Sequence, residues 1–128
     1  MTRRDGTDAP PDVDYAFEHE DTAPRAARNA LSPIVGWGSF ADDVKLASSE
    51  LVTNVVRHTP NGGRMLAWDA DPLRLEVHDN SSTLPASNSR PTAGGRGLRI
   101  VDEVSSDWGA ERTPGGKMVW VEFDRRSA

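Results

Sequence analysis

The feature that most constrains the fold is an amphipathic segment that runs from Phe40 to His58. Its apolar residues recur at every third or fourth position, which is the spacing of one face of an α-helix. These residues are Phe40, Val44, Ala47, Leu51 and Val55. We expect this helix to end before Pro60, because proline cannot continue a helix, and to be covered by other parts of the chain.

Two polar residues accompany the apolar stripe. Glu50 and Asn54 are four positions apart, so they lie on the same side of the helix. At about 100° per residue, Asn54 lies about 70° from the centre of the stripe and Glu50 about 110°. They could be ordinary residues at the border of a buried face. They could instead line a cleft, where the amide oxygen suits Mg²⁺ and the carboxylate orients or deprotonates a nucleophile. His58 continues the stripe, which favours a core histidine.

The remaining segments predict an α+β fold, with the helices covering one face of a mostly antiparallel sheet. Expected strands and helices alternate along the chain in the order strand, helix, helix, two strands, loop, helix and two strands. Their approximate ranges are 14–20, 22–35, 40–58, 64–70, 72–79, 97–106 and, for the closing hairpin, 108–124. We expect a disordered tail at residues 1–13, one domain at 14–124 and a short C-terminal tail at 125–128.

Composition excludes several classes of protein. A length of 128 residues indicates one domain, and a net charge of −5 without a basic block argues against direct nucleic-acid binding. The absence of cysteine excludes disulfides, thiolate nucleophiles and Cys-bound zinc, and it fits a cytoplasmic protein. No apolar run is long enough to span a membrane, and the N-terminus does not have the pattern of a signal peptide.

Three further features point to a ligand. Asp79 ends a predicted strand, where it can hydrogen-bond its own loop or accept a bond from an exocyclic amine. Residues 80–93 are polar and aperiodic, and a loop of this length is often a lid. Gly94, Gly95 and Gly97 then lead into a helix start, which favours anions, although their spacing fits neither standard phosphate-binding motif.

In combination these segments resemble the GHKL ATPase family, the ATP-binding module of gyrase, heat-shock chaperones, sensor histidine kinases and mismatch-repair proteins. ELVTNVVRHT resembles the N box, and VHDNS stands where the first glycine box would be. GGRGLRIVDEVSSDWG resembles the second glycine box with its helix, and GGKMVWVEF the closing strand pair. The resemblance covers residues 14–124. With E-L-V-T-N and G-G-R-G-L in succession, it is most specific to the short anti-sigma-factor kinases.

The resemblance implies a Bergerat-type two-layer α/β sandwich that binds ATP and Mg²⁺. It implies that Asn54 binds the Mg²⁺ that bridges the phosphates, that Glu50 acts as the base or orients the attacking group, and that Asp79 accepts a hydrogen bond from the adenine amine. Residues 83–93 would form the ATP lid. The residues expected near the phosphates are Gly94, Gly95, Arg96, Gly97, Leu98 and His58.

Two positions depart from the family pattern. Ser81 stands where the first glycine box usually has glycine, which allows the backbone to approach the nucleotide closely. Met118 stands where many relatives carry threonine near the adenine, so one hydroxyl contact would be absent.

The function implied by the resemblance is an anti-sigma factor and serine/threonine kinase. Its partners would be a sigma factor and an anti-sigma antagonist with an acceptor Ser or Thr, without nucleic acid or membrane, and relatives of this type tend to form homodimers. The alternative is a nucleotide-sensing binding module without kinase activity. A sensor-kinase fragment is disfavoured, because no phospho-acceptor helix pair precedes the domain.

Overall fold

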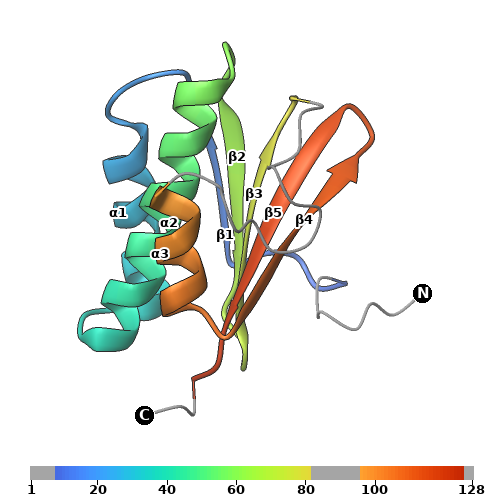
Figure 1. Cartoon of the computed structure of the whole chain (residues 1–128). Coiled ribbons are helices and arrows are strands. Elements are labelled where there is room, and N and C mark those ends of the chain that lie inside the picture. Colours follow the sequence, from blue (N-terminus) through green and yellow to red (C-terminus); the bar gives the residue numbers. More distant parts are fainter. Residues whose placement is uncertain (1–7, 82–95, 126–128) are drawn as a thin grey trace.

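The computed structural model describes residues 8–81 and 96–125 of the chain. Within these ranges the chain forms three helices and five strands (Figure 1). In chain order they are β1 (Val13–Phe17), α1 (Ala23–Val35), α2 (Ser39–His58), β2 (Gly63–Trp68), β3 (Leu73–Asp79), α3 (Arg96–Val104), β4 (Asp107–Thr113) and β5 (Gly116–Phe123).

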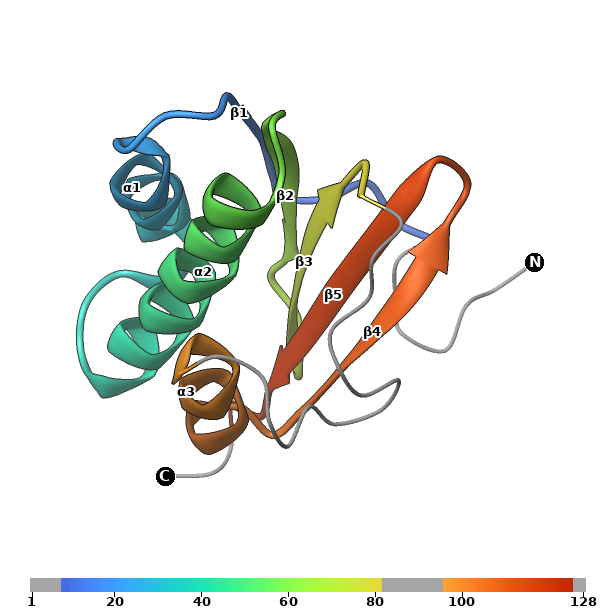
Figure 2. The ribbon, with the colours of Figure 1, turned by 45° about the horizontal axis from the view of Figure 1, so that its top comes forward.

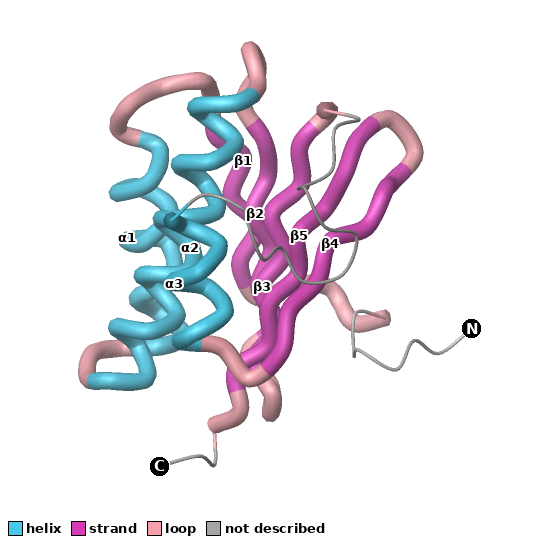
Figure 3. Tube along the Cα trace, viewed as in Figure 1, coloured by secondary structure: helices cyan, strands magenta, loops and turns pink. Residues whose placement is uncertain are grey.

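The strands form one sheet in the order β1-β2-β3-β5-β4. All four pairings among the described strands are antiparallel. The three helices form a second layer on one face of this sheet, as Figures 2 and 3 show. The expected α+β fold, with helices on one face of a mostly antiparallel sheet, is therefore confirmed.

The hydrophobic core lies between the two layers, with α2 at its centre. The predicted stripe is confirmed there, since Val44, Ala47, Leu51 and Val55 are buried and Phe40 packs against the core. On the sheet side every second residue of β3 contributes, in keeping with the two-residue period of a strand. These inward-facing residues of β3 are Leu73, Leu75 and Val77.

The first helix continues past a proline and ends at Val35, the last residue of the range that the sequence predicts. Pro33 lies inside α1, which extends to Val35. Gly36 then ends the helix with a φ of 65°, and its N–H donates to the Ser32 carbonyl at 2.9 Å. A positive φ suits glycine because it has no Cβ, so Gly36 sets this end of the helix.

The N-terminal strand begins at Val13, and residues just before it also contact the sheet. The Trp68 indole N–H donates to the Ala9 carbonyl at 2.8 Å, and the Asp12 N–H donates to the Ala67 carbonyl at 2.8 Å. Residues 9–13 were expected in a disordered tail, but these contacts attach them to the domain. This segment is too short for its contacts with the sheet to be predicted from the sequence.

The outer face of the sheet, opposite the helices, carries a chain of buried charges. Arg74 donates to Glu76 at 2.9 Å and to Glu122 at 3.0 Å, and the His78 Nε2 lies 2.8 Å from the other oxygen of Glu76. The Arg74 guanidinium also lies 4.9 Å from the centre of the Trp120 ring. Arg74 and Glu76 are each only 4% exposed, so their charges depend on one another rather than on water.

None of the described helices is both long enough and apolar enough to cross a membrane.

Candidate functional site

The two polar residues on α2 lie where the helical wheel predicts. Glu50 and Asn54 are both half-buried. They are one turn apart, about 6 Å along the helix axis. Neither side chain hydrogen-bonds another residue in the described part of the chain, so both can reach a ligand.

The hydroxyl groups next to this pair are already used. Ser48, Ser49 and Thr53 donate to backbone carbonyls one turn earlier in α2, at 2.8, 3.0 and 2.6 Å. A hydroxyl bonded in this way to its own helix is not available as a nucleophile or a metal ligand without breaking that bond. Among the polar side chains of this part of α2, Glu50 and Asn54 are the available ones.

His58 is exposed at the C-terminal end of α2, so the expectation of a core histidine is wrong. The apolar stripe ends one turn earlier, at Val55, and the buried position beyond the helix is taken by Thr59. The Thr59 hydroxyl donates to the Val55 carbonyl at 2.9 Å.

Asp79 ends β3 on the face that carries the helices. It follows Leu73, Leu75 and Val77 at the same two-residue period. Its carboxylate is only 2% exposed, with Oδ2 at 3.2 Å from the Lys117 Nζ. Its Oδ1 accepts the Ser81 N–H at 2.7 Å. The local hydrogen bond that the sequence offered as one alternative is therefore present, and the side chain also faces the helix layer.

Met118 does not lie beside Asp79. It pairs with His78, whereas Asp79 pairs with Lys117, and successive residues of a strand point to opposite faces. Met118 therefore points to the outer face of the sheet, away from Asp79, whereas the resemblance places it near the adenine that Asp79 is expected to bind. The register between the two strands cannot be read from a single sequence, and Lys117 was missed for that reason.

Ser81 replaces a glycine of the family pattern without backbone strain. In the described part of the chain no residue other than glycine has a positive φ. Ser81 is half-buried, and its N–H is held by the Asp79 carboxylate. Its conformation therefore does not require glycine.

The start of α3 carries the remaining predicted residues that the structure describes. Arg96 and Gly97 form its first turn, and the Leu98 side chain is 6% exposed in the core. Only the backbone N–H of Leu98 is therefore suited to a phosphate, since first-turn N–H groups have no acceptor within the helix. Gly94, Gly95 and the expected lid at 83–93 lie outside the described residues.

The elements that carry these residues meet. α2 packs on α3 and on β3, and α3 begins beside α2 (Figure 2). A Cβ added at Gly63 would lie 2.4 Å from the His78 carbonyl oxygen and 3.4 Å from Val55 Cγ1. The end of β3 that carries Asp79 therefore lies close to the turn of α2 that carries Asn54.

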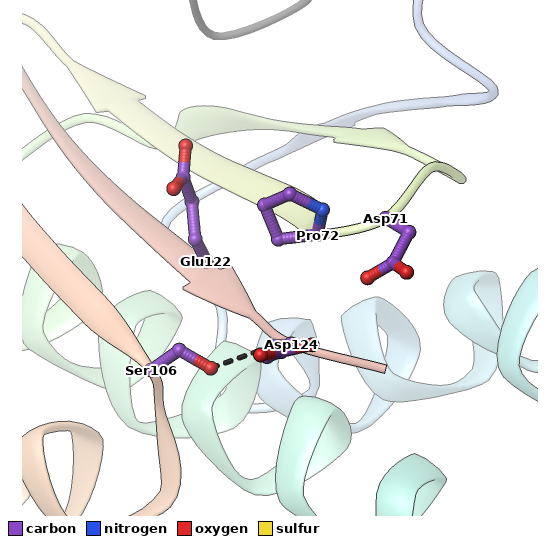
Figure 4. Close-up of a pocket in the computed structure, with 5 residues that line it drawn as sticks. All are labelled: Asp71, Pro72, Ser106, Glu122 and Asp124. Carbon is purple, nitrogen blue, oxygen red and sulfur yellow. Dashed lines mark hydrogen bonds between the residues drawn. The ribbon is translucent and has the colours of Figure 1, made fainter. Parts of the chain in front are cut away.

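Two cavities lie at the other end of these elements. One of about 450 Å³ is lined by Asp71, Pro72, Ser106, Glu122 and Asp124 (Figure 4). Asp71 and Pro72 precede β3, whereas Asp79 ends it.

The other cavity, of about 360 Å³, lies between the start of α2 and the end of α3. Its lining residues are Ser39, Phe40, Asp43, Glu103, Val104, Ser105, Ser106, Phe123 and Asp124. Neither cavity borders a residue that the sequence predicted for a site.

The described residues contain no group of three or more His, Asp or Glu side chains that could hold a metal by themselves. Mg²⁺ at a phosphate site needs fewer protein ligands, because phosphate oxygens and water complete its coordination. The single free amide oxygen of Asn54 fits that kind of site.

Comparisons with known proteins agree with this geometry. The family described as histidine kinase-like ATPase domain matches residues 16–123. The fold resembles the histidine kinase domain of the blue-light activated histidine kinase from Erythrobacter litoralis EL346, with a TM-score of 0.54 and 20% sequence identity. That match covers 79% of this chain and 58% of the other, so this chain corresponds to little more than half of that domain. No curated protein matches the chain. By its match over nearly the whole sequence, the chain belongs to the histidine kinase-like ATPase family.

Proposed function

We propose that the protein binds ATP with Mg²⁺ and acts as an anti-sigma factor that phosphorylates an anti-sigma antagonist on serine or threonine. The observation that carries the proposal is the pair of half-buried, unengaged side chains on α2, Glu50 and Asn54, near the Asp79 end of β3. Family membership supports the nucleotide. The partners rest on the resemblance of E-L-V-T-N and G-G-R-G-L to the anti-sigma-factor kinases.

Each side chain has a separate role in this proposal. The Asn54 oxygen ligates Mg²⁺, which neutralises charge on the phosphates when it is bound. The Glu50 carboxylate orients the acceptor hydroxyl and takes its proton. Asp79 accepts a hydrogen bond from the adenine amine, and the first turn of α3, at Arg96 and Gly97, presents backbone N–H groups to the phosphates.

Calorimetry with ATP, with and without Mg²⁺, tests nucleotide binding. We expect Asn54→Ala to remove the Mg²⁺-dependent part of the binding heat. Asn29→Ala, the same change at an exposed position of α1, is the matched control and should bind as the unmodified protein does. The absence of binding at millimolar ATP would refute the proposed function.

Phosphoryl transfer is tested by incubating the protein with labelled ATP and candidate antagonists. Glu50→Gln should retain ATP binding and lose transfer by about 10²–10⁴-fold, the usual effect of removing a general base. Glu103→Gln, at an exposed position of α3, is the control. Full transfer by Glu50→Gln would show that Glu50 is not the base.

A nucleotide-sensing module without kinase activity is the alternative, and the same assay separates the two. ATP binding without label on any antagonist would favour the sensor. Under either function the protein would act in the cytoplasm on protein partners, a sigma factor among them, without direct contact to nucleic acid.

A further inference from the structure

The carboxylate that is expected to recognise adenine already has a partner for each oxygen. Asp79 Oδ2 lies 3.2 Å from the Lys117 ammonium, and Oδ1 accepts the Ser81 N–H at 2.7 Å. The side chains of Asp79 and Lys117 are 2% and 14% exposed. The pair is thus an ion pair that is largely removed from water, where such contacts are weakly screened.

The backbone places Lys117 directly opposite Asp79. The two residues are register partners of β3 and β5. β5 starts after a tight turn in which Pro114 precedes Gly115, whose φ of 87° is the kind that the third residue of a type II turn requires. A Cβ at Gly116 would lie 1.9 Å from the Asp79 carbonyl oxygen, so glycine is needed for this close approach.

This arrangement has a consequence for any ligand that donates a hydrogen bond to Asp79. With 2% of the side chain exposed, a further donor has little access to Oδ2 while the Lys117 ammonium lies 3.2 Å from it. The flexible four-carbon stem of lysine allows the ammonium to leave, but leaving requires that the ion pair be broken. Ser81 holds the other oxygen through the backbone, and that contact is not easily displaced.

We propose that Lys117 is a displaceable counter-ion of Asp79 that competes with the exocyclic amine of adenine and so sets the affinity for adenine nucleotides. The inference rests on the proposed function, because it takes Asp79 as the acceptor of that amine. In the free protein, the conformation in which Lys117 has left Asp79 is then the minor one, and only this conformation can receive the base. The observed dissociation constant for ATP is therefore raised in inverse proportion to the population of that conformation.

The test compares three variants by calorimetry with ATP and with inosine triphosphate, which carries a carbonyl in place of the amine. Lys117→Ala removes the competitor and lets water reach Asp79, so ATP should bind at least about tenfold more tightly, as expected for a minor state populated to about 10% or less. Lys117→Arg restores the counter-ion and should bind ATP as weakly as the unmodified protein. Lys45→Ala changes the only other lysine of the chain, which contacts the Gly36 carbonyl, and should have no effect.

The gain should be specific to the amine, so inosine triphosphate, whose carbonyl cannot donate to Asp79, should bind no more tightly to Lys117→Ala than to the unmodified protein. An equal gain for both nucleotides would overturn the inference, because the amine would not then be the group that competes. Weaker ATP binding by Lys117→Ala would also overturn it and would make Lys117 a direct ligand of the nucleotide. If no variant binds any nucleotide at millimolar concentration, the proposed function fails together with the inference. If ATP binds equally to all variants, only the inference fails.

Discussion

The buried ion chain on the outer face of the sheet makes a quantitative prediction about Glu76. One of its oxygens accepts from Arg74 at 2.9 Å and the other lies 2.8 Å from His78, while 4% of the residue is exposed. Glu76→Gln keeps the shape but removes the charge, and it turns an NH₂ group toward one of the two donors. Breaking a buried ion pair by removal of one charge costs about 3–5 kcal/mol.

We take the lower end of this range, because Arg74 keeps its bond to Glu122 at 3.0 Å and the His78 side chain is 32% exposed and can bind water. Glu76→Gln should therefore lower the free energy of unfolding by about 3 kcal/mol. For a domain of this size that corresponds to a fall in Tm of about 10 °C. Thermal and urea unfolding followed by circular dichroism at neutral pH would measure both quantities.

The matched control is Glu111→Gln, the same change on the same face of the sheet at an exposed position of β4. It should change stability by no more than about 0.5 kcal/mol. If Glu76→Gln costs no more than this control, the buried ion chain contributes nothing and the reasoning is refuted.

The same carboxylate gives the direction of a pH dependence. Burial raises the pKa of Glu76, but the hydrogen bonds from His78 and Arg74 and their charges together outweigh burial, so its pKa lies below the usual 4.5. A carboxyl with a lowered pKa in the folded state stabilises the protein above its unfolded-state pKa, and this contribution is lost as the pH falls through the folded-state pKa. The stability difference between the unmodified protein and Glu76→Gln should therefore be constant near neutral pH and decrease below about pH 4.5.

Three further changes have effects that follow from the described contacts. Gly116→Ala should lower the free energy of unfolding, measured in urea, by about 3 kcal/mol, because the added Cβ would lie 1.9 Å from a backbone oxygen of β3. Gly115→Ala should lower it by about 1 kcal/mol, because this position lies in open space but has a φ of 87°. Equal costs would contradict the close approach of β3 and β5. Trp108→Phe should lower the free energy of unfolding by about 1 kcal/mol more than the loss of packing alone would. The reason is that the indole N–H donates to Asp102 at 2.8 Å and so connects β4 to α3. Trp37→Ala should change Tm little, since the side chain is 85% exposed; a large loss would mean that its contact with Lys45, at 5.3 Å from the ring centre, carries more than an exposed cation–π pair usually does.

The sequence predicted the helix layer well because its signals are local. The stripe from Phe40 to Val55 specifies which face of α2 is buried, and the half-buried positions of Glu50 and Asn54 follow from that face alone. A helix repeats its geometry at every turn, so a wheel drawn from the sequence gives nearly the same answer as the structure.

The errors arose where distant segments meet. Met118 was expected beside the adenine, but whether it or Lys117 faces Asp79 depends on the register of β5 against β3, which a single sequence does not contain. His58 continued the apolar pattern by spacing, yet it is the last residue of α2 and is exposed to solvent. Periodicity alone cannot indicate where the covering layer ends.

The alternation of β3 connects the stability of this domain to its site. Odd-numbered residues from Leu73 to Val77 enter the core, and Asp79 continues the same face toward the helices. Even-numbered residues carry the ion chain of Arg74 and Glu76 on the outer face. A slip of one residue would turn Asp79 away from α2 and would bury Arg74 and Glu76 among apolar side chains without their partners, at a cost of several kcal/mol for each charge. The buried charges on the outer face thus specify the register that directs Asp79 and Lys117 toward the helix layer.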